Sequence, residues 1–303
     1  MTAQRTPGLV RGFSSGAAAY LIWGSFPIII TALSFANAWE VIAWRVIFGF
    51  VFGVIFVLAL RNGREIFQAL KSRKTFLLII VSTVMIYINW SVYVFAVATK
   101  HTVDASLGYF INPLFTILIA VLFLKERLSR LQVVAVALAL VSVSILTVNY
   151  GAPPWLALAL AASFSIYGYA KNQLSGSISS LNGYVVESGI LVPVAGLQLI
   201  ILAGQPGSQL SFGSAGLWET LGLVGFGFLT AIPLILFGEA AKHLPLSWVG
   251  LMQYLTPTLQ FIVAVLILGE PMSLPRWIGF AFVWIALVVL TIDASRKFKS
   301  RTR

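Results

Sequence analysis

Residues 107–129 read LGYFINPLFTILIAVLFLKERLS, and residues 251–273 read LMQYLTPTLQFIVAVLILGEPMS. A shift of 144 residues aligns the two stretches, and eight of the 23 positions are then identical, including Pro113 with Pro257. Apolar composition alone would give about two or three identities, and it would not align a proline. The two stretches are therefore copies of an internal repeat. Each is dominated by an apolar run of the length that crosses a bilayer, about 20 residues.

The composition of the whole chain agrees with a membrane protein. Of its 303 residues, 59% are hydrophobic and 10% are charged, whereas a soluble domain carries about 25% charged residues. A soluble fold of this size could not hide so much apolar surface. The 13% of aromatic residues also excludes a disordered chain.

Hydropathy predicts an all-α polytopic membrane protein with ten transmembrane helices. Short loops and a basic tail at 294–303 fill the rest, so no soluble domain fits. The first span is too long to be the apolar region of a cleaved signal peptide. The ten spans are expected at 12–33, 38–60, 75–98, 103–124, 131–149, 153–171, 184–203, 216–240, 246–269 and 275–293.

The basic residues set the expected orientation. With a cytoplasmic N-terminus, seventeen Lys and Arg fall in inside segments, against Lys100 and Arg276 outside and Arg45 within the second span. This bias predicts that both termini are cytoplasmic. The net charge of +11 is then explained by contact with anionic lipid at the cytoplasmic face. The basic residues do not gather on one helix face, so the sequence gives no indication of nucleic-acid binding.

The repeat divides the chain into residues 12–149 and residues 153–293. Because each half holds five spans, an odd number, the second half must enter the membrane inverted relative to the first. Trp23 in the first span aligns with Tyr167 in the sixth at the same shift of 144. Two inverted five-helix repeats are typical of secondary transporters.

The repeated stretches also resemble a known family. The run from Asn112 to Ser129, repeated from Pro257 to Ser273, resembles the repeat signature of the EamA family in the drug/metabolite transporter superfamily. The stretch from Asp104 to Pro113, with Trp23-Gly24, Asn89-Trp90 and Gln253-Tyr254, is similar to the RarD subfamily, historically labelled chloramphenicol-sensitive protein. The resemblance implies ten helices, two EamA repeats and export of small molecules across the bacterial inner membrane. It leaves the substrate open.

Aromatic and amide side chains deep in the spans are the candidates for a central solute site. Asn89 and Tyr93 share one helix face because they are four residues apart. An amide at this depth needs a partner, and a bond between helices explains it as well as a solute contact does. The expected substrate-binding residues are Trp23, Asn89, Trp90, Tyr93, Tyr109, Asn112, Tyr167, Gln253 and Tyr254.

The aligned prolines are expected to act as hinges in spans four and nine. Pro113 and Pro257 each lack a backbone N–H, and each crowds the carbonyl four residues earlier. A carbonyl freed in the membrane must face protein or a wet cavity. The alternative is a packing kink, because proline is common in membrane helices.

Two charges inside spans are candidates for function. An ionised group at a helix centre costs about 2.5–3.5 kcal/mol. Glu187 could couple transport to protons or bind a substrate amine. Arg45 could bind an anion or act as a gate, and structural pairing is the alternative for this residue.

The remaining candidates are structural. Glu126 and Glu270 end spans four and nine, where a carboxylate can cap the free N–H groups of the next helix. His101 and His243 fall on opposite membrane faces, so they cannot share a metal. The chain contains no cysteine, and we expect neither a metal nor a cofactor.

These features predict a secondary carrier that moves a neutral, zwitterionic or amphipathic solute by alternating access through a central cavity. The alternatives are an intramembrane enzyme and a channel or scaffold. An enzyme is disfavoured because the sequence contains no HExxH or Gly-x-Ser-x-Gly motif. A channel would favour charged rings, which are not visible. The oligomeric state stays open.

Overall fold

The computed structural model describes residues 5–61, 63–124, 128–174, 176–206, 209–244 and 252–301. All regular secondary structure in these ranges is helical. The helices are α1 (Arg5–Ala32), α2 (Ala38–Ala59), α3 (Arg64–Lys71), α4 (Arg73–Ala98), α5 (Thr102–Leu124), α6 (Arg130–Tyr150), α7 (Trp155–Leu174), α8 (Ser180–Ala203), α9 (Leu217–His243), α11 (Leu255–Ile262), η1 (Val263–Ile267) and α12 (Leu274–Arg301).

The predicted spans overlap these helices. Nine of the ten segments each overlap one helix, and the ninth segment, expected at 246–269, is described only from residue 252 and contains α11 and the π-helical turn η1. Eight of the described helices are long and apolar enough to cross a membrane, and α11 with η1 forms a shorter apolar helix. The other matching helix, α7, carries several polar residues and packs against α4 and α5. Contacts with other helices shield these polar groups from lipid.

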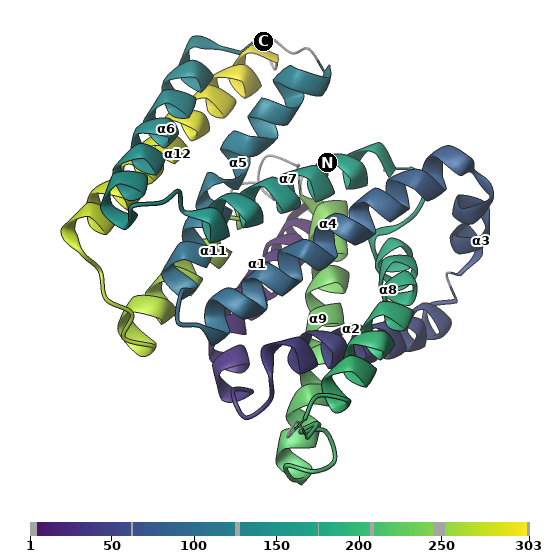
Figure 1. Cartoon of the computed structure of the whole chain (residues 1–303). Coiled ribbons are helices and arrows are strands. Elements are labelled where there is room, and N and C mark those ends of the chain that lie inside the picture. The colour runs from purple at the N-terminus through teal and green to yellow at the C-terminus, as the bar shows by residue number, and fades with distance from the viewer. Residues whose placement is uncertain are drawn as a thin grey trace.

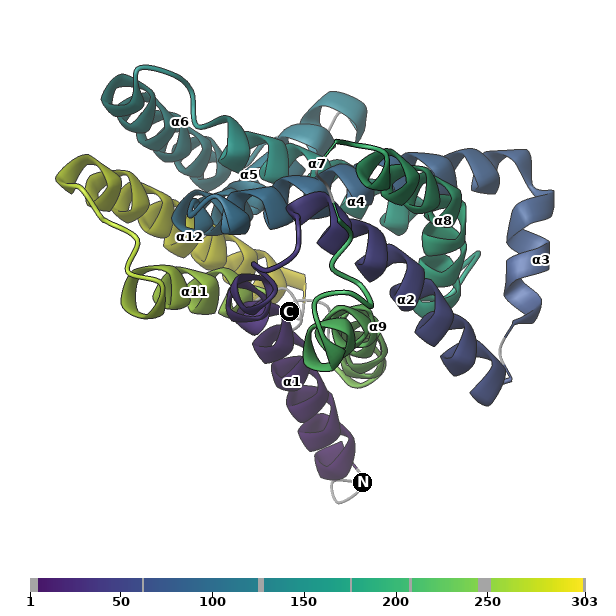
Figure 2. The same cartoon turned by 60° about the horizontal axis from the view of Figure 1, so that its bottom comes forward.

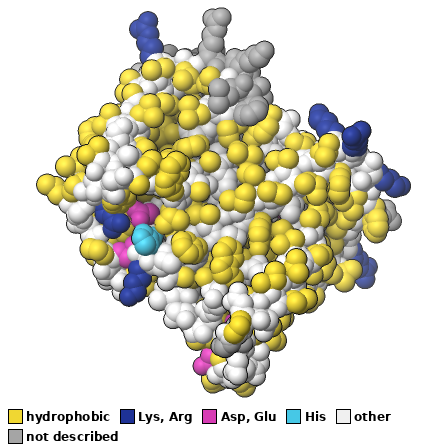
Figure 3. Space-filling model, in the orientation of Figure 1, with side chains coloured by type: hydrophobic (Ala, Val, Ile, Leu, Met, Phe, Trp, Pro, Cys, Tyr) yellow, Lys and Arg dark blue, Asp and Glu magenta, His cyan; other side chains and the backbone are white. Residues whose placement is uncertain are grey.

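The surface of the molecule is apolar where a membrane would cover it. Large hydrophobic side chains such as Leu58, Val148 and Ile200 are 70%, 84% and 70% exposed. Hydrophobic atoms dominate the face in Figure 3, and charged side chains lie near its margin. Contiguous apolar surface on this scale indicates contact with lipid. The chain is therefore a multi-pass membrane protein.

Short polar sequences begin several of the helices. Asn37 accepts a hydrogen bond from the backbone N–H of Trp39 at the start of α2. Ser129 and Gln132 form a reciprocal capping box at the start of α6. These side chains satisfy N–H groups that have no partner within the helix. Gly151, with φ of 71°, ends α6 in the left-handed conformation that glycine favours.

Helices from the two halves of the sequence pack together (Figures 1 and 2). α1 packs on α9 and α11, α7 packs on α4 and α5, and α2 packs on α8 and α9. α6 and α12 lie side by side. Small residues allow close approach: a Cβ added to Gly108 of α5 would lie 2.7 Å from the carbonyl oxygen of Ala157 in α7.

The two predicted hinges differ from each other. Pro113 lies inside α5, which is one continuous helix, so its role as a hinge stays a prediction. The hydroxyls of Thr116 and Ser165 donate to the carbonyl of Asn112, the residue before Pro113, at 3.1 and 3.0 Å. Pro257, in contrast, lies near the start of a helix. It is the third residue of α11, directly after a turn at 253–254, where a missing N–H costs little.

Candidate functional site

Arg45 lies where α2 meets helices of the second half. It is seven residues from the first residue of α2, about 10 Å along the helix, and its side chain is 3% exposed. Its Nε donates a hydrogen bond to Oγ1 of Thr230 in α9 at 3.1 Å. The Thr230 hydroxyl in turn donates to the carbonyl of Phe226 at 2.8 Å, which fixes its lone pairs toward the guanidinium.

Three aromatic rings surround the Arg45 guanidinium. Its central carbon lies 4.4 Å from the ring centre of Trp90, 5.1 Å from that of Phe226 and 5.4 Å from that of Phe26. Cations are attracted to ring faces at these distances, and the attraction grows when water is excluded. The rings thus stabilise the positive charge without neutralising it.

The charge and donors of Arg45 are only partly satisfied. In the described part of the chain, its Nη1 is buried without a hydrogen-bond partner, and so is the hydroxyl of Tyr93. The hydroxyls of Tyr93, Tyr109 and Tyr184 lie close enough to interact with its charge, but no described carboxylate pairs with it. Buried polar groups are nearly always bonded, so this arginine needs an explanation.

An amide network lies beside this arginine. Asn89 Nδ2 donates to the carbonyl of Leu160 and to the hydroxyl of Ser163, both at 3.2 Å. Its Oδ1 accepts from the Tyr109 hydroxyl at 2.9 Å, and the Tyr109 ring packs against Tyr93. The structure therefore brings Asn89, Trp90, Tyr93 and Tyr109 together around Arg45.

Asn112 makes a second connection between α5 and α7. Its Nδ2 donates to the carbonyl of Ala161 at 3.2 Å and to the hydroxyl of Ser165 at 2.7 Å. The side chain is buried. Its amide donors thus already bond protein atoms in this conformation.

The other expected solute contacts have further neighbours of their own, and Trp23 packs against the apolar cluster that contains Phe26 and Phe226. Trp23 packs against Tyr20 and Phe237, with ring centres 5.7 and 6.2 Å away. Tyr254 lines a shallow apolar pocket with Trp284 of α12. Gln253 lies in the turn before α11, and its carbonyl, expected to be free, accepts from the N–H of Thr256 at 3.3 Å.

Glu187 is buried in α8 with a positive partner. Its side chain is 1% exposed, and Oε1 accepts from Lys171 Nζ at 3.1 Å and from the Ser82 hydroxyl at 2.6 Å. The Lys171 ammonium also lies 5.7 Å from the ring centre of Tyr167. Tyr167 therefore belongs to the surroundings of this ion pair.

Glu270 joins the two halves of the sequence. Its two carboxylate oxygens accept from the backbone N–H groups of Thr102 and Val103 at 2.7 and 2.8 Å. Glu270 thus caps α5. The sequence predicts instead a cap on the helix that follows Glu270. Gly269, with φ of 67°, and the preceding π turn lead the chain into this position. Glu126, its counterpart, lies outside the described residues.

Next to this cap, Asp104 and Arg276 form an ion pair of 3.5 Å between Oδ2 and Nη2. The Tyr150 hydroxyl accepts from Arg276 Nε at 2.6 Å and donates to Asp104 Oδ1 at 3.1 Å. This triad connects α5, α6 and α12.

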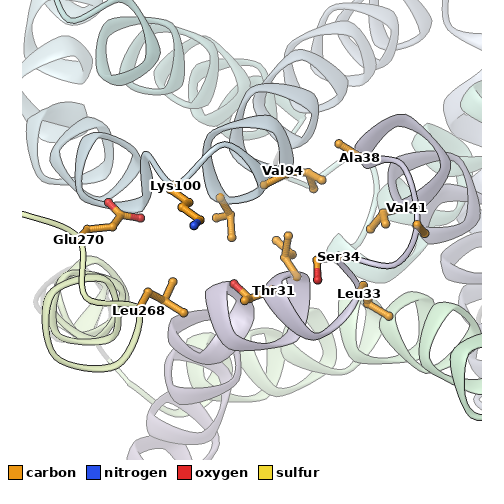
Figure 4. Close-up of a pocket in the computed structure, with 13 residues that line it drawn as sticks. Thr31, Leu33, Ser34, Ala38, Val41, Val94, Lys100, Leu268 and Glu270 are labelled. Carbon is orange, nitrogen blue, oxygen red and sulfur yellow. The ribbon is translucent and has the colours of Figure 1, made fainter.

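A pocket of about 200 Å³ opens beside the end of α1 (Figure 4). The figure shows Lys100 and Glu270 at one end of it, and Ala38 and Val41 at the other. Its walls come from the ends of α1 and α4, the start of α2 and Leu268. Val41 is one helical turn from Arg45, so the pocket approaches the buried charge without reaching it.

The sequence does not identify the residues that contact Arg45 and Glu187. Thr230 and Phe226 contact Arg45 from α9, 185 residues away in the case of Thr230. In the sequence, Lys171, the partner of Glu187, counts only as one of the seventeen basic residues of the inside segments. Hydropathy carries no signal for such pairings, because it does not fix how helices rotate about their axes.

Comparison with known proteins gives consistent results. Residues 10–148 match the EamA-like transporter family. The chain is 42% identical over 301 residues to "Protein RarD" of Streptomyces exfoliatus, covering 99% of this chain and 93% of that protein. It is 38% identical over 288 residues to "Uncharacterized transporter YojE" of Bacillus subtilis, covering 93% and 94%. A crystal structure with 19% identity matches with a TM-score of 0.61 over 96% of this chain and 99% of that one, which supports the fold alone.

Proposed function

This chain belongs to the EamA-like transporter family, in the RarD subfamily of the drug/metabolite transporter superfamily, and on that premise we propose that it is a secondary carrier. In this proposal it exports a small solute across the bacterial inner membrane by alternating access. The observation that carries the proposal is the buried polar centre at Arg45, where the two halves of the sequence meet. A central site between two such halves can be opened toward either side in turn.

The helix packing supports an arrangement of two related halves. If α1 corresponds to α7, then its neighbours α9 and α11 correspond to α4 and α5, the observed neighbours of α7. α2 with α8, and α6 with α12, pair with their own counterparts. This pattern of contacts is expected when two five-helix repeats are related by a two-fold axis in the membrane plane.

The polar centre draws on both halves. Arg45 and Trp90 belong to the first, while Thr230 and Phe226 belong to the second. A solute bound there would therefore contact surfaces that move relative to each other during the transport cycle. With cytoplasmic termini, the pocket at Lys100 and Glu270 faces the outside and forms the entrance on that side.

The absence of cysteine makes a topology test direct. We expect a single cysteine at Ser214, between α8 and α9, to react with a membrane-impermeant maleimide in intact cells. A cysteine at Ser72, between α3 and α4, should react only after the membrane is opened. The reverse pattern would contradict cytoplasmic termini and export in the proposed sense.

Transport itself is testable in proteoliposomes. Counterflow with a panel of labelled amino acids, amphenicols and small organic acids should detect protein-dependent exchange of at least one solute. Protein-free liposomes and liposomes with heat-denatured protein serve as controls. Electrogenic flux at rates of millions of ions per second would indicate a channel, and chemical conversion of a panel member would indicate an enzyme.

A further inference from the structure

The unmatched charge of Arg45 points to the chemistry of the solute. We propose that Arg45 is the anion-recognition residue of this protein and binds the carboxylate of a small organic acid with an apolar body. This inference rests on the proposed carrier function, because the binding site is the polar centre between the two halves. It names the substrate class, which the family relationship leaves open.

The first argument is the state of the guanidinium. An arginine side chain offers five N–H donors in a rigid fork and has no acceptor. In the described part of the chain, its Nε bonds the neutral hydroxyl of Thr230, and Nη1 has no partner. Leaving a buried charge without a counter-ion is costly, and Glu187, another buried charge, does have an ionic partner, Lys171. A carboxylate would supply the counter-ion that Arg45 lacks among the described residues.

The second argument is the geometry of the hydrogen-bond donors on the guanidinium group. A guanidinium fork binds a carboxylate through two parallel hydrogen bonds, and such pairs are among the strongest in proteins. The hydroxyl of Tyr93 is likewise buried without a hydrogen-bond partner in the described part of the chain. Buried donors without partners favour a ligand that offers acceptor atoms.

The third argument is the apolar surroundings. The rings of Phe26, Trp90 and Phe226 surround the guanidinium, and the nearby pocket is lined largely by apolar side chains such as Val41 and Val94. A phosphate with two negative charges would need more cations than this one arginine. A single carboxylate on an apolar body matches one charge inside an aromatic and aliphatic lining.

The approach to the site is also suited to an anion. Lys100 lies at the mouth of the pocket (Figure 4). The carboxylate of Glu270, at the same end, is already bonded to the N–H groups of Thr102 and Val103. Lys100 thus brings a positive charge to this end of the pocket, where it would attract an anion. A rearrangement of the pocket wall at Val41, one helical turn from Arg45, would then open a path to the guanidinium.

The test uses three probes of the same size that differ in charge: 3-phenylpropionate, its neutral amide 3-phenylpropanamide, and the cation 3-phenylpropylamine. Binding to the full-length protein in detergent is measured by isothermal titration calorimetry. We expect the carboxylate to bind at least about tenfold more tightly than the amide, because a hydrogen bond to a charged group contributes 1.5–3 kcal/mol. The amine should bind most weakly.

Variants assign this selectivity to Arg45. Arg45→Gln should reduce the ratio of carboxylate to amide affinity to about one, and Arg45→Lys should leave an intermediate ratio, because the charge is kept and the fork is lost. Arg276→Gln is the matched control, since this arginine already has Asp104 as partner, and it should keep the native ratio. The native protein provides the decisive measurement even if Arg45→Gln fails to fold.

The outcomes separate the two proposals. Absence of carboxylate preference in the native protein, or preference that survives in Arg45→Gln, would overturn the role of Arg45 and leave the carrier function standing. Binding of 3-phenylpropionate that depends on Arg45, without any flux of it into proteoliposomes, would support the anion site and count against the carrier function.

Discussion

Arg45 and Glu187 occupy corresponding places in the fold: each lies seven residues after the first residue of its helix, α2 or α8, and each is buried. These helices are the second span of each half, and they pack against each other. The two charges are opposite, and their surroundings differ. Glu187 has Lys171 as an ionic partner at 3.1 Å, whereas Arg45 has aromatic rings and one threonine.

Tyr184 of α8 lies between the helices that carry the two charges. Its ring packs against Trp90, with ring centres 6.3 Å apart, and its hydroxyl lies directly against Gly49 of α2, where an added Cβ would collide with it. The two halves thus share one architecture but differ in how each buried charge is satisfied. In our proposal this asymmetry leaves Arg45 available to an anion, while Glu187 is held in an ion pair.

The first prediction concerns that ion pair. If the carrier is coupled to protons, Glu187→Gln should abolish accumulation of a transported solute driven by a pH gradient, while exchange without a gradient continues. The reason is that a glutamine at this position cannot gain or lose the proton that would open and close the pair with Lys171. The measurement is uptake into proteoliposomes with and without an imposed pH difference.

Glu65→Gln is the matched control for this experiment, because it makes the same chemical change near the start of α8 but outside the membrane spans. It should keep accumulation driven by pH. Normal accumulation in Glu187→Gln would exclude this residue as the coupling group.

The second prediction separates the structural role of Asn112 from a role in binding. Asn112→Ala should lower the free energy of unfolding by about 1–3 kcal/mol, because it leaves the buried polar groups of α7 without their donor. Unfolding in a titration with sodium dodecyl sulfate measures this loss. Gln253→Ala, which alters a partly exposed side chain in a turn, should change stability by less than about 0.5 kcal/mol. A binding defect with unchanged stability would instead make Asn112 a solute ligand.

The sequence predicts the helices well and the site only in part. Apolar runs near 20 residues locate eight helices that are long and apolar enough to cross a membrane, because the bilayer thickness fixes the length of such runs. The face shared by Asn89 and Tyr93 is found from helical periodicity, and both side chains contact Tyr109. The packing of Trp23 against Phe237 and the place of Tyr254 beside Trp284 are not found, because apolar lipid and apolar protein favour the same residues and hydropathy cannot orient a helix. The hydrogen bond that Ser165 of α7 donates to the Asn112 carbonyl of α5 likewise follows from no local pattern.

The third prediction uses the pH dependence of stability. Hydrogen bonds donated by the Ser179 backbone and the Asn182 side chain lower the pKa of Glu65 below its ordinary value of 4.5. A carboxylate whose pKa is depressed in the folded state contributes stability that is fully present above the ordinary pKa. That contribution is lost as the pH falls through the lower pKa of the folded state.

Native protein and Glu65→Gln should therefore differ in thermal unfolding midpoint near pH 6, with the native protein more stable. The difference should shrink as the pH approaches 3, because the native carboxyl becomes protonated. A difference that stays constant across this range would show that the contact contributes through packing and not through its charge.

The fourth prediction concerns the cap that Glu270 places on α5. Its carboxylate accepts two backbone N–H groups at the positive end of the helix, where a negative charge is most favourable. In Glu270→Gln the amide nitrogen faces an N–H donor in place of an acceptor, so one bond and the charge are lost. The nearby charge of Asp104 repels Glu270, which offsets a small part of this loss. We expect a decrease of about 1–3 kcal/mol in the free energy of unfolding.

Glu270→Gln should also loosen the wall of the pocket that Lys100 and Glu270 line. The reason is that the two hydrogen bonds of the Glu270 carboxylate hold the segment after η1 against α5. A single cysteine at Val97, a buried residue of that wall, should then react faster with maleimide in Glu270→Gln than in the native background. Glu65→Gln is the control, since it weakens the start of α8 and leaves the pocket untouched. If both variants react at the native rate, the Glu270 carboxylate stabilises α5 alone and does not hold the two halves together at this face.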